Sequence, residues 1–176
     1  MLIRKAQGFA LIDLIFVCGM IGLLSSIAVP KLVMAKQSAG AASALGSMRT
    51  IGSAQLSYAL TCGNGFYAPT LTTLGTPPPG TSQPFITGGL GIANTVAKSG
   101  YLIQMAATPW PSAPGTCNGV GAGLTGQGFA ATADPADAVY PRYFATNANN
   151  LIYEHTTTLF SVMPDVGEPP AGHPVR

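Results

Sequence analysis

Charge is the scarcest feature of this sequence. The 176 residues include eight lysines and arginines and six aspartates and glutamates, so charged residues make up only 8% of the chain, against about 25% in ordinary soluble domains. The net charge is +2 and no long run of like charges occurs. A nucleic-acid-binding surface needs a basic patch that neutralises several phosphates. We therefore expect no nucleic-acid partner.

The residues that usually carry catalysis are also few. The only histidines, His155 and His173, have no cysteine or second histidine nearby at metal-ligand spacing. No G-x-S-x-G nucleophile motif is present, and we expect no glycine loop that binds a phosphate. We therefore predict a protein that is not an enzyme and that has no catalytic residue, cofactor or metal site.

What the sequence does contain is a long apolar run near its start. Phe9 to Val29 is 21 residues long and includes one carboxylate, Asp13, and one thiol, Cys18. As a helix it would span roughly 30 Å, which is the thickness of the hydrocarbon core of a bilayer. Arg4 and Lys5 precede the run, and positive residues of this kind hold an N-terminus in the cytoplasm. The run is therefore a candidate membrane span that sends the remaining chain outward.

A conventional secretory signal is the alternative interpretation of this run. Signal peptides also pair a basic start with an apolar stretch, but that stretch is usually about 7–15 residues long and ends at a small-residue cleavage site. Here the run is longer and passes through Ala28, Val29 and Pro30 into a helix-like segment. The length favours a membrane span.

The residues 8–13, GFALID, carry a family resemblance. Followed by an apolar run and Pro30, they resemble the N-terminal motif of type IV pilins and of type II secretion pseudopilins, G-F-T-L-I-E followed by about twenty apolar residues and a proline. The acidic residue five positions after Gly8, an internal glycine at Gly22 and the proline all fall in register.

The resemblance implies a processing and assembly route. A prepilin peptidase would cleave after Gly8 and methylate the new amino terminus at Phe9. The implied partners are that peptidase, an inner-membrane assembly platform, membrane lipid, and copies of the chain or related pilin subunits. The precursor would be a single-pass inner-membrane protein, and the product would belong to a periplasmic or extracellular filament.

Asp13 has a specific role in that interpretation. A carboxylate in a bilayer centre costs roughly 2.5–3.5 kcal/mol on insertion scales and normally faces a partner. In the family, the acidic residue contacts the positive amino terminus of a neighbouring subunit and sets its axial register. Aspartate is one methylene shorter than the usual glutamate, so its reach to that amine and the efficiency of methylation are questions for experiment. The alternative is an interfacial carboxylate near the headgroups that needs no partner.

The helical pattern continues after Pro30. We predict one helix from about Ala10 to Leu60, kinked at Pro30 because proline lacks a backbone donor, with Gly22 contributing to the kink region. The positions predicted to form one stripe of its outer half are Met34, Ala41, Leu45, Met48, Gly52, Leu56 and Ala59. We expect this half to pack against the protein's own sheet, whereas the first half packs against other subunits. An ordinary core helix would explain the outer half equally well.

The remainder reads as a loop-rich head. We predict a turn at 62–65, a loop around Pro77-Pro78-Pro79-Gly80 and a short helix at 91–99. The predicted strands are 101–105, 128–133, 142–146 and 151–156. The last two are joined by the asparagine-rich turn 147–150.

The predicted fold class is therefore α+β and pilin-like, with a long N-terminal membrane-spanning helix packed against a small antiparallel sheet. The predicted divisions are a leader at 1–8, a membrane and filament-core helix at 9–30, and the amphipathic outer helix at 31–61. A globular head follows at 62–163, and a flexible proline-rich tail at 164–176.

Two of the three cysteines lie outside the membrane run. Cys62 and Cys117 would face an oxidising compartment, and we predict a disulfide that closes a loop of roughly 55 residues and contributes about 4 kcal/mol in the chain-entropy model. The alternative is two free thiols. Cys18 lacks the electropositive, exposed setting of a reactive thiol and is expected to be a small apolar residue.

Asp134 and Asp137 lie three residues apart and are the one pair that suggests a metal. Loops of major pseudopilins bind calcium, but calcium takes six to eight oxygens, so two carboxylates suffice only if backbone carbonyls contribute. A turn that begins at Asp134-Pro135 is the favoured alternative. Trp110, between two prolines, is either an adhesive surface contact or a side chain packed over its loop.

The sequence thus predicts a structural subunit of an envelope-spanning filament, a type IV pilus pilin-like protein. The first alternative is a pseudopilin of the type II secretion system. The second is a membrane-tethered binding domain that keeps its anchor.

Overall fold

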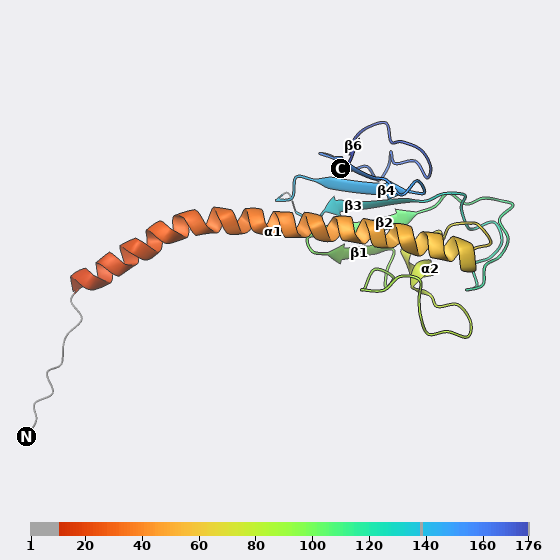
Figure 1. Cartoon of the computed structure of the whole chain (residues 1–176), viewed down its shortest axis with the longest axis horizontal. Helices are drawn as coiled ribbons and strands as arrows, with labels where there is room; N and C mark the ends of the chain where they lie inside the picture. The colour runs from red at the N-terminus through yellow and green to blue at the C-terminus, as the bar shows by residue number, and fades with distance from the viewer. Residues whose placement is uncertain (1–10, 138, 176) are drawn as a thin grey trace, which may run out of the picture. The chain divides into compact units, whose positions relative to one another are not determined.

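The computed structural model describes residues 11–137 and 139–175 (Figure 1). The chain divides into two compact units, Met1–Ser38 and Ala39–Arg176. This boundary differs from the predicted divisions at residues 30 and 61, because the outer part of the long helix belongs to the same unit as the sheet. The leader residues Gly8 and Phe9 lie outside the described residues.

One helix, α1 (Leu11–Thr61), accounts for the described N-terminal part of the chain. It continues through Pro30, as Figure 1 shows. Proline cannot donate a hydrogen bond to the carbonyl four residues earlier, which here is that of Ser26. The Ser26 side chain itself donates from Oγ to the carbonyl of Leu23 at 2.7 Å. The predicted helix from 10 to 60 is confirmed over its described length, whereas the kink stays a prediction.

The helix ends where the sequence places its turn. The backbone N–H of Gly65 donates to the carbonyl of Ala59 at 2.9 Å, and that of Gly63 donates to Tyr58 at 2.8 Å. Asn64 and Gly65 adopt positive φ angles of 52° and 89°, the conformation that commonly closes a helix C-terminus.

The sheet is a six-stranded antiparallel meander in which each strand pairs with the next along the chain. Its strands are β1 (Thr95–Lys98), β2 (Tyr101–Ala106), β3 (Ala130–Pro135), β4 (Tyr143–Asn147), β5 (Ile152–His155) and β6 (His173–Pro174). The α+β prediction is therefore confirmed as a long apolar helix with a small antiparallel sheet, and four predicted strands agree with β2 to β5 within about two residues.

The helix predicted at 91–99 is wrong. Thr95 to Lys98 form edge strand β1, which pairs with β2 in the register Lys98 to Tyr101. Ser99 and Gly100 make the turn with positive φ angles of 52° and 84°, as a tight hairpin requires. A four-residue segment has too little periodicity to distinguish a helix from a strand, and pairing with β2 decided its conformation.

A short helix, α2 (Leu71–Gly75), lies in the segment that was predicted to be a loop. The Thr70 side chain caps it by accepting from the N–H of Thr73 at 3.3 Å. Leu71 and Leu74 are fully buried, so α2 supplies apolar packing to the head.

The main core lies between the outer part of α1 and one face of the sheet. Alternate residues of β2, Tyr101, Ile103 and Met105, point into it, as the period of a strand requires. The buried residues of α1 that belong to it are Ala41, Ala44, Met48, Ile51, Ala54 and Tyr58. This core holds the helix and the sheet together.

The predicted stripe on α1 is partly wrong. Met34 and Leu56 are 51% and 46% exposed, whereas Ile51 and Tyr58, which the prediction left out, are fully buried. The real stripe is rotated toward Ile51 and Tyr58 because a bulky residue buries more apolar area than the small residues on which the prediction relied.

Gln55 is a fully buried polar residue on this face of α1. Its side-chain amide forms two reciprocal bonds with the backbone of Ala68: Nε2 donates to the carbonyl at 2.9 Å, and Oε1 accepts from the N–H at 2.8 Å. Nε2 also lies 3.0 Å from Met105 Sδ. The amide thereby fixes the chain that leaves the helix against α1.

Replacing Gln55 by leucine should lower the free energy of unfolding by about 2–4 kcal/mol, because it leaves a buried N–H and a buried carbonyl of Ala68 without partners. Urea unfolding of the full chain in detergent would measure this loss. Gln127→Leu is the control, since Gln127 is exposed and should change stability by less than about 0.5 kcal/mol. Equal effects of the two changes would contradict the proposed role.

The C-terminal residues are not a free tail. Residues 156–172, here called the C-terminal strap, pack against β4 and β5 on the other face of the sheet and lead into β6, which pairs with Tyr153 and Glu154 of β5. Leu159 and Met163 of the strap form a second core with Ala145 and Tyr153. The tail predicted at 164–176 therefore contributes the sixth strand. Its prolines suggested disorder, but its contacts with distant strands order it.

Candidate functional site

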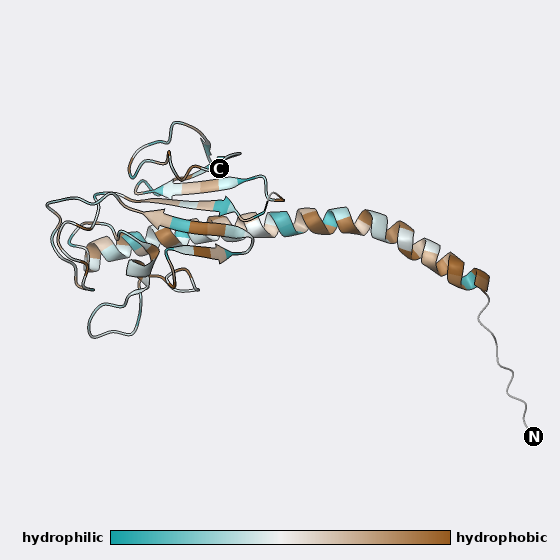
Figure 2. Ribbon diagram, turned by 180° about the vertical axis from the view of Figure 1, so that it is seen from behind, coloured by the Kyte–Doolittle hydropathy of each residue, from teal (hydrophilic) through white to brown (hydrophobic). Residues whose placement is uncertain are grey.

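The N-terminal part of α1 exposes a largely apolar surface. Its large side chains range in exposure from 42% at Val33 to 77% at Leu11. Figure 2 shows this end of the ribbon mainly in the brown of hydrophobic residues. The exposed side chains are Leu11, Ile12, Leu14, Ile15, Phe16, Val17, Met20, Ile21, Leu23, Leu24, Ile27, Val29, Leu32, Val33 and Met34.

An apolar surface of this size is not left in water by a stable protein. In the part of the chain that the structure describes, α1 is the one helix that is long and apolar enough to cross a membrane, and none of its most apolar window is buried by the protein. Residues 11–34 are therefore a candidate membrane anchor.

Asp13 lies in the first described turn of this helix, and its side chain is exposed. Neighbouring positions along the chain are apolar, and no described residue forms an ion pair or hydrogen bond with it. The sequence contains no other acidic residue before Asp134. Asp13 is thus a single carboxylate on an otherwise apolar surface.

Gly22 and Cys18, the other two positions singled out in this segment, also lie on the helix surface. A side chain added at Gly22 would meet nothing within 4 Å, so the glycine is not required by packing within the chain. Cys18 is an exposed free cysteine among apolar neighbours.

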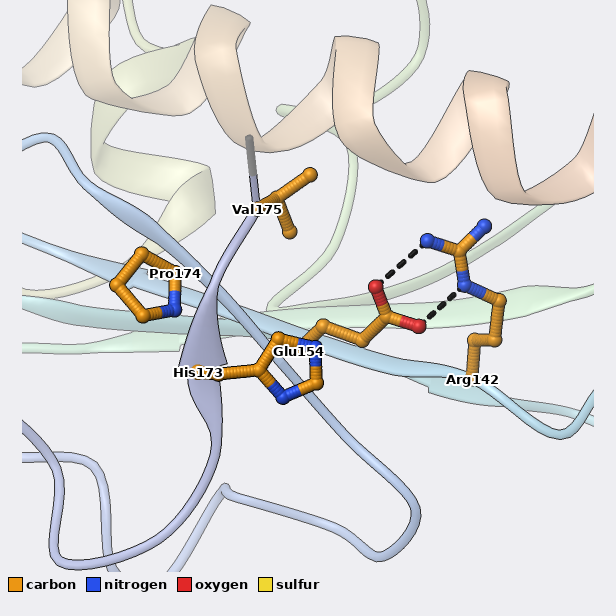
Figure 3. Close-up of a pocket in the computed structure, with 5 residues that line it drawn as sticks. All are labelled: Arg142, Glu154, His173, Pro174 and Val175. Atoms are coloured by element: carbon orange, nitrogen blue, oxygen red, sulfur yellow. Dashed lines mark hydrogen bonds and ion pairs between the residues drawn. The ribbon is translucent and has the colours of Figure 1, made fainter.

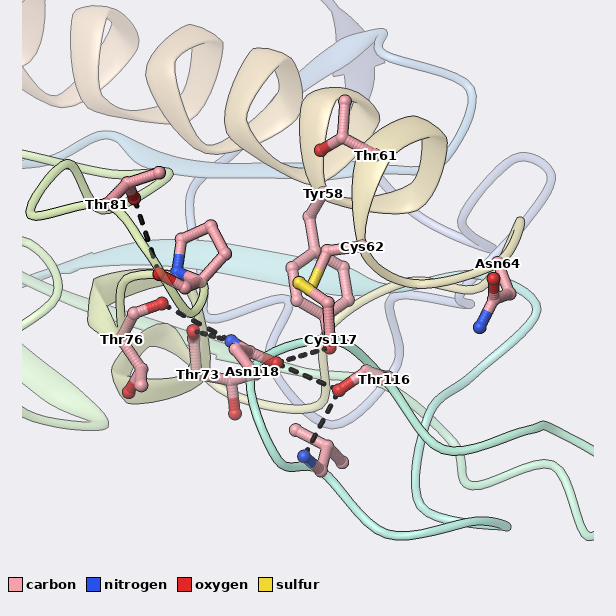
Figure 4. The surroundings of a disulfide bond; sticks show 12 residues. Tyr58, Thr61, Cys62, Asn64, Thr73, Thr76, Thr81, Thr116, Cys117 and Asn118 are labelled. Atoms are coloured by element: carbon pink, nitrogen blue, oxygen red, sulfur yellow. Dashed lines mark hydrogen bonds between the residues drawn. A yellow bond between two sulfur atoms is a disulfide. The ribbon is translucent and has the colours of Figure 1, made fainter.

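The disulfide between Cys62 and Cys117 is present and joins the end of α1 to the loop before β3 (Figure 4). The two Cα atoms lie 4.9 Å apart. This confirms the predicted pairing.

Asn118, next to this bridge, connects three segments. Its Oδ1 accepts from Tyr58 Oη at 3.3 Å and from Thr116 Oγ1 at 2.9 Å, and its Nδ2 donates to the carbonyl of Thr73 at 2.9 Å. Burial raises the pKa of Tyr58, and the smaller effect of the neighbouring Thr116 side chain lowers it. No sequence pattern pointed to Asn118, since its partners lie far away in the chain.

A cavity of about 460 Å³ lies beside the edge of the sheet, lined by Arg142, Glu154, His173, Pro174 and Val175 (Figure 3). Arg142 Nη2 donates to Glu154 Oε2 at 2.6 Å, and Arg142 Nε donates to Glu154 Oε1. The hydrogen bonds from Arg142 lower the pKa of Glu154, against the smaller effect of burial. Because the charges of Arg142 and Glu154 cancel, this pair gives the cavity no net charge.

The metal site considered at Asp134 and Asp137 is not assembled. Among the described residues, no group of three or more histidine, cysteine, aspartate or glutamate side chains could hold a metal ion. Asp137 is exposed, whereas Asp134 lies within β3 and accepts from Thr158 Oγ1 at 2.5 Å. Asp134 therefore continues the strand and does not begin a turn.

Two further sequence features carry no site. Residues 121–126, GAGLTG, have the spacing G-x-G-x-x-G, contrary to the expectation of no such glycine loop, but they lie in a loop that opens no helix. A dinucleotide-binding motif needs a helix N-terminus at that point. Trp110 is 43% exposed, so it is neither fully packed over its loop nor fully free.

Comparison of the chain with models of protein families, with curated proteins and with solved structures found no match.

Proposed function

We propose that the protein is a pilin-like structural subunit that is inserted into the inner membrane, cleaved after Gly8 and assembled through the N-terminal part of α1 into a filament. The observation that carries the proposal is the combination of the 8–13 motif with an apolar helix surface that the chain itself leaves uncovered. In this proposal the surface of residues 11–34 passes from lipid to neighbouring subunits.

The composition supports the same function. Removal of residues 1–8 takes away Arg4 and Lys5 and leaves six basic and six acidic side chains. A chain without net charge can stack against copies of itself without long-range repulsion. The head, which carries a disulfide, suits an oxidising compartment outside the cytoplasm.

Two other functions use the same anchor. A pseudopilin of the type II secretion system would share the cleavage and the assembly chemistry, and the genes adjacent to this one would distinguish it from a pilus subunit. A membrane-tethered binding domain would instead keep its N-terminus uncut. The candidate anchor and the cavity beside Arg142 are the observations that favour this second alternative.

Intact-mass measurement of the protein purified from membranes tests the proposal. We expect the mass of residues 9–176 with the disulfide formed and one added methyl group, because cleavage and methylation both occur at Phe9. Replacing Gly8 by a bulky residue should leave the full-length precursor, since a side chain there obstructs the peptidase. A wild-type chain that starts at Met1, or that starts near Ala28 as a secretory signal would give, would contradict the proposal.

A further inference from the structure

The C-terminal strap is fastened to the sheet at two places of unequal strength. At its far end, Asn147 Nδ2 donates to the carbonyls of Pro164 and Gly167 at 3.0 and 2.6 Å. There Asp165 Oδ2 also accepts from the N–H of Thr108 at 2.8 Å. At its near end, a single side-chain bond joins the strap to the sheet, from Thr158 Oγ1 to Asp134 Oδ2.

Asp134 is a half-buried carboxylate at this near end. Its second oxygen, Oδ1, is buried and has no hydrogen-bond partner. Two other buried side-chain oxygens on the sheet, Thr132 Oγ1 and Tyr153 Oη, also lack partners. The strand register places Thr132 and Tyr153 on either side of Ala145, and Asp134 follows Thr132 on the same face of β3 because side chains alternate along a strand.

Among residues 11–137 and 139–175, no basic side chain compensates the carboxylate. The described ion pair of the head joins Arg142 to Glu154, and no described basic residue is paired with Asp134. The titratable side chains around it are the exposed Asp137 beyond the end of β3, and Tyr143, His155 and Tyr153 on β4 and β5. Burial raises the pKa of Asp134, against the smaller effect of the Thr158 hydrogen bond. The titratable residues of the strap are the acids Asp165 and Glu168, which supply no positive charge.

We propose that Asp134 is a proton-binding site that controls the strap: the strap closes more firmly when Asp134 is protonated and opens more readily when it is ionised. Burial of one carboxylate oxygen without a hydrogen-bond partner disfavours the charged form, and opening the strap would let water reach that oxygen. Protonation on Oδ1 removes the charge and leaves Oδ2 free to accept from Thr158. The proposal does not depend on filament assembly.

The direction of the pH dependence follows from linkage. A carboxyl whose pKa is raised in the closed state binds a proton there before it does so in the open state. The closed strap is therefore stabilised as the pH falls through the raised pKa of Asp134. This gain in stability is complete once the pH is below the ordinary pKa of an aspartate. A carboxylate held by a cation would show the opposite dependence.

Hydrogen exchange of the full-length protein in detergent, followed by mass spectrometry over residues 156–172, tests this proposal. Between about pH 8 and about pH 4, after correction for intrinsic exchange, we expect protection of the strap to rise at least threefold, since one unit of pKa difference corresponds to a tenfold change in the equilibrium. Asp134→Asn, which resembles the protonated carboxyl, should give high protection at every pH.

Two controls separate this mechanism from general effects. Asp137→Asn removes an exposed carboxylate three residues away and should leave the wild-type pH response. His155→Gln should also keep the wild-type pH response, and this result would exclude the His155 imidazole, on the same face of the sheet, as the titrating group. The proposal is overturned if wild-type protection does not change with pH, if it falls at low pH, or if Asp134→Asn retains the pH response. A purely structural role of Asp134 would lower protection in the Asn variant at every pH.

Discussion

Asp13→Ala should leave membrane insertion unchanged and reduce the yield of assembled filaments by at least about tenfold, because in the proposed filament Asp13 is the negative partner of a neighbour's amino terminus and alanine would leave that charge unpaired. Insertion depends on the apolar run as a whole, and the substitution makes that run more apolar. Sedimentation of sheared filaments, with quantification of the membrane-bound precursor in the same cells, separates the two effects.

Matched variants make the result specific to the carboxylate. Asp13→Asn should fail in the same way, since it keeps the size and loses the charge, whereas Asp13→Glu should assemble at least as well as the wild type. Ser25→Ala is the control for a polar change within the same helix segment. Wild-type filament yield from the alanine and asparagine variants would show that the membrane merely tolerates Asp13. Intact masses of all four variants would report whether methylation at Phe9 depends on the side-chain length.

Replacing Cys62 and Cys117 by serine should lower the free energy of unfolding by about 4 kcal/mol, as the chain-entropy model gives for a closed loop of this separation, 55 residues. The loss should be accompanied by loosening around Asn118, whose bonds to Tyr58 and Thr73 rely on its position beside the bridge. Denaturant unfolding of the full chain, followed by Trp110 fluorescence, would measure the change.

The reduced wild-type protein provides the internal comparison. A reductant should destabilise it by a similar amount and should leave the double serine variant unchanged. Cys18→Ser is the control, because this exposed residue takes no part in the bridge, and it should shift the stability of the head by less than about 0.5 kcal/mol. If the free energies of unfolding of the double variant and the wild type differ by less than about 1 kcal/mol, the bridge does not restrict the unfolded chain as the chain-entropy model assumes.

Several elements of the fold were predictable from the sequence because their causes are local. The long helix follows from an apolar run without strand alternation and ends at a glycine and asparagine turn. The hairpin of β4 and β5 follows from Asn150, which adopts a positive φ of 57°. The disulfide followed from the expected oxidising compartment and the small number of cysteines. Each of these depends on residues close together in the chain or on composition alone.

The errors have a common origin in long-range contacts. Thr95 to Lys98 became a strand because β2 offered an edge, and the proline-rich C-terminus became ordered because β5 and Asn147 bind it. Gln55 reads as a polar helix residue, yet its amide pairs with Ala68, thirteen positions away. None of these partners can be read from a local pattern.

The sequence by itself therefore determined the apolar span, the single carboxylate within it and the candidate membrane anchor, since hydrophobicity and charge are properties of each residue. Only the tertiary structure decided which face of α1 is buried, that the C-terminal strap packs against β4 and β5, and that one carboxylate oxygen of Asp134 is buried without a hydrogen-bond partner. Burial and hydrogen bonding depend on which distant segments meet, and those meetings follow from the packing of the whole head.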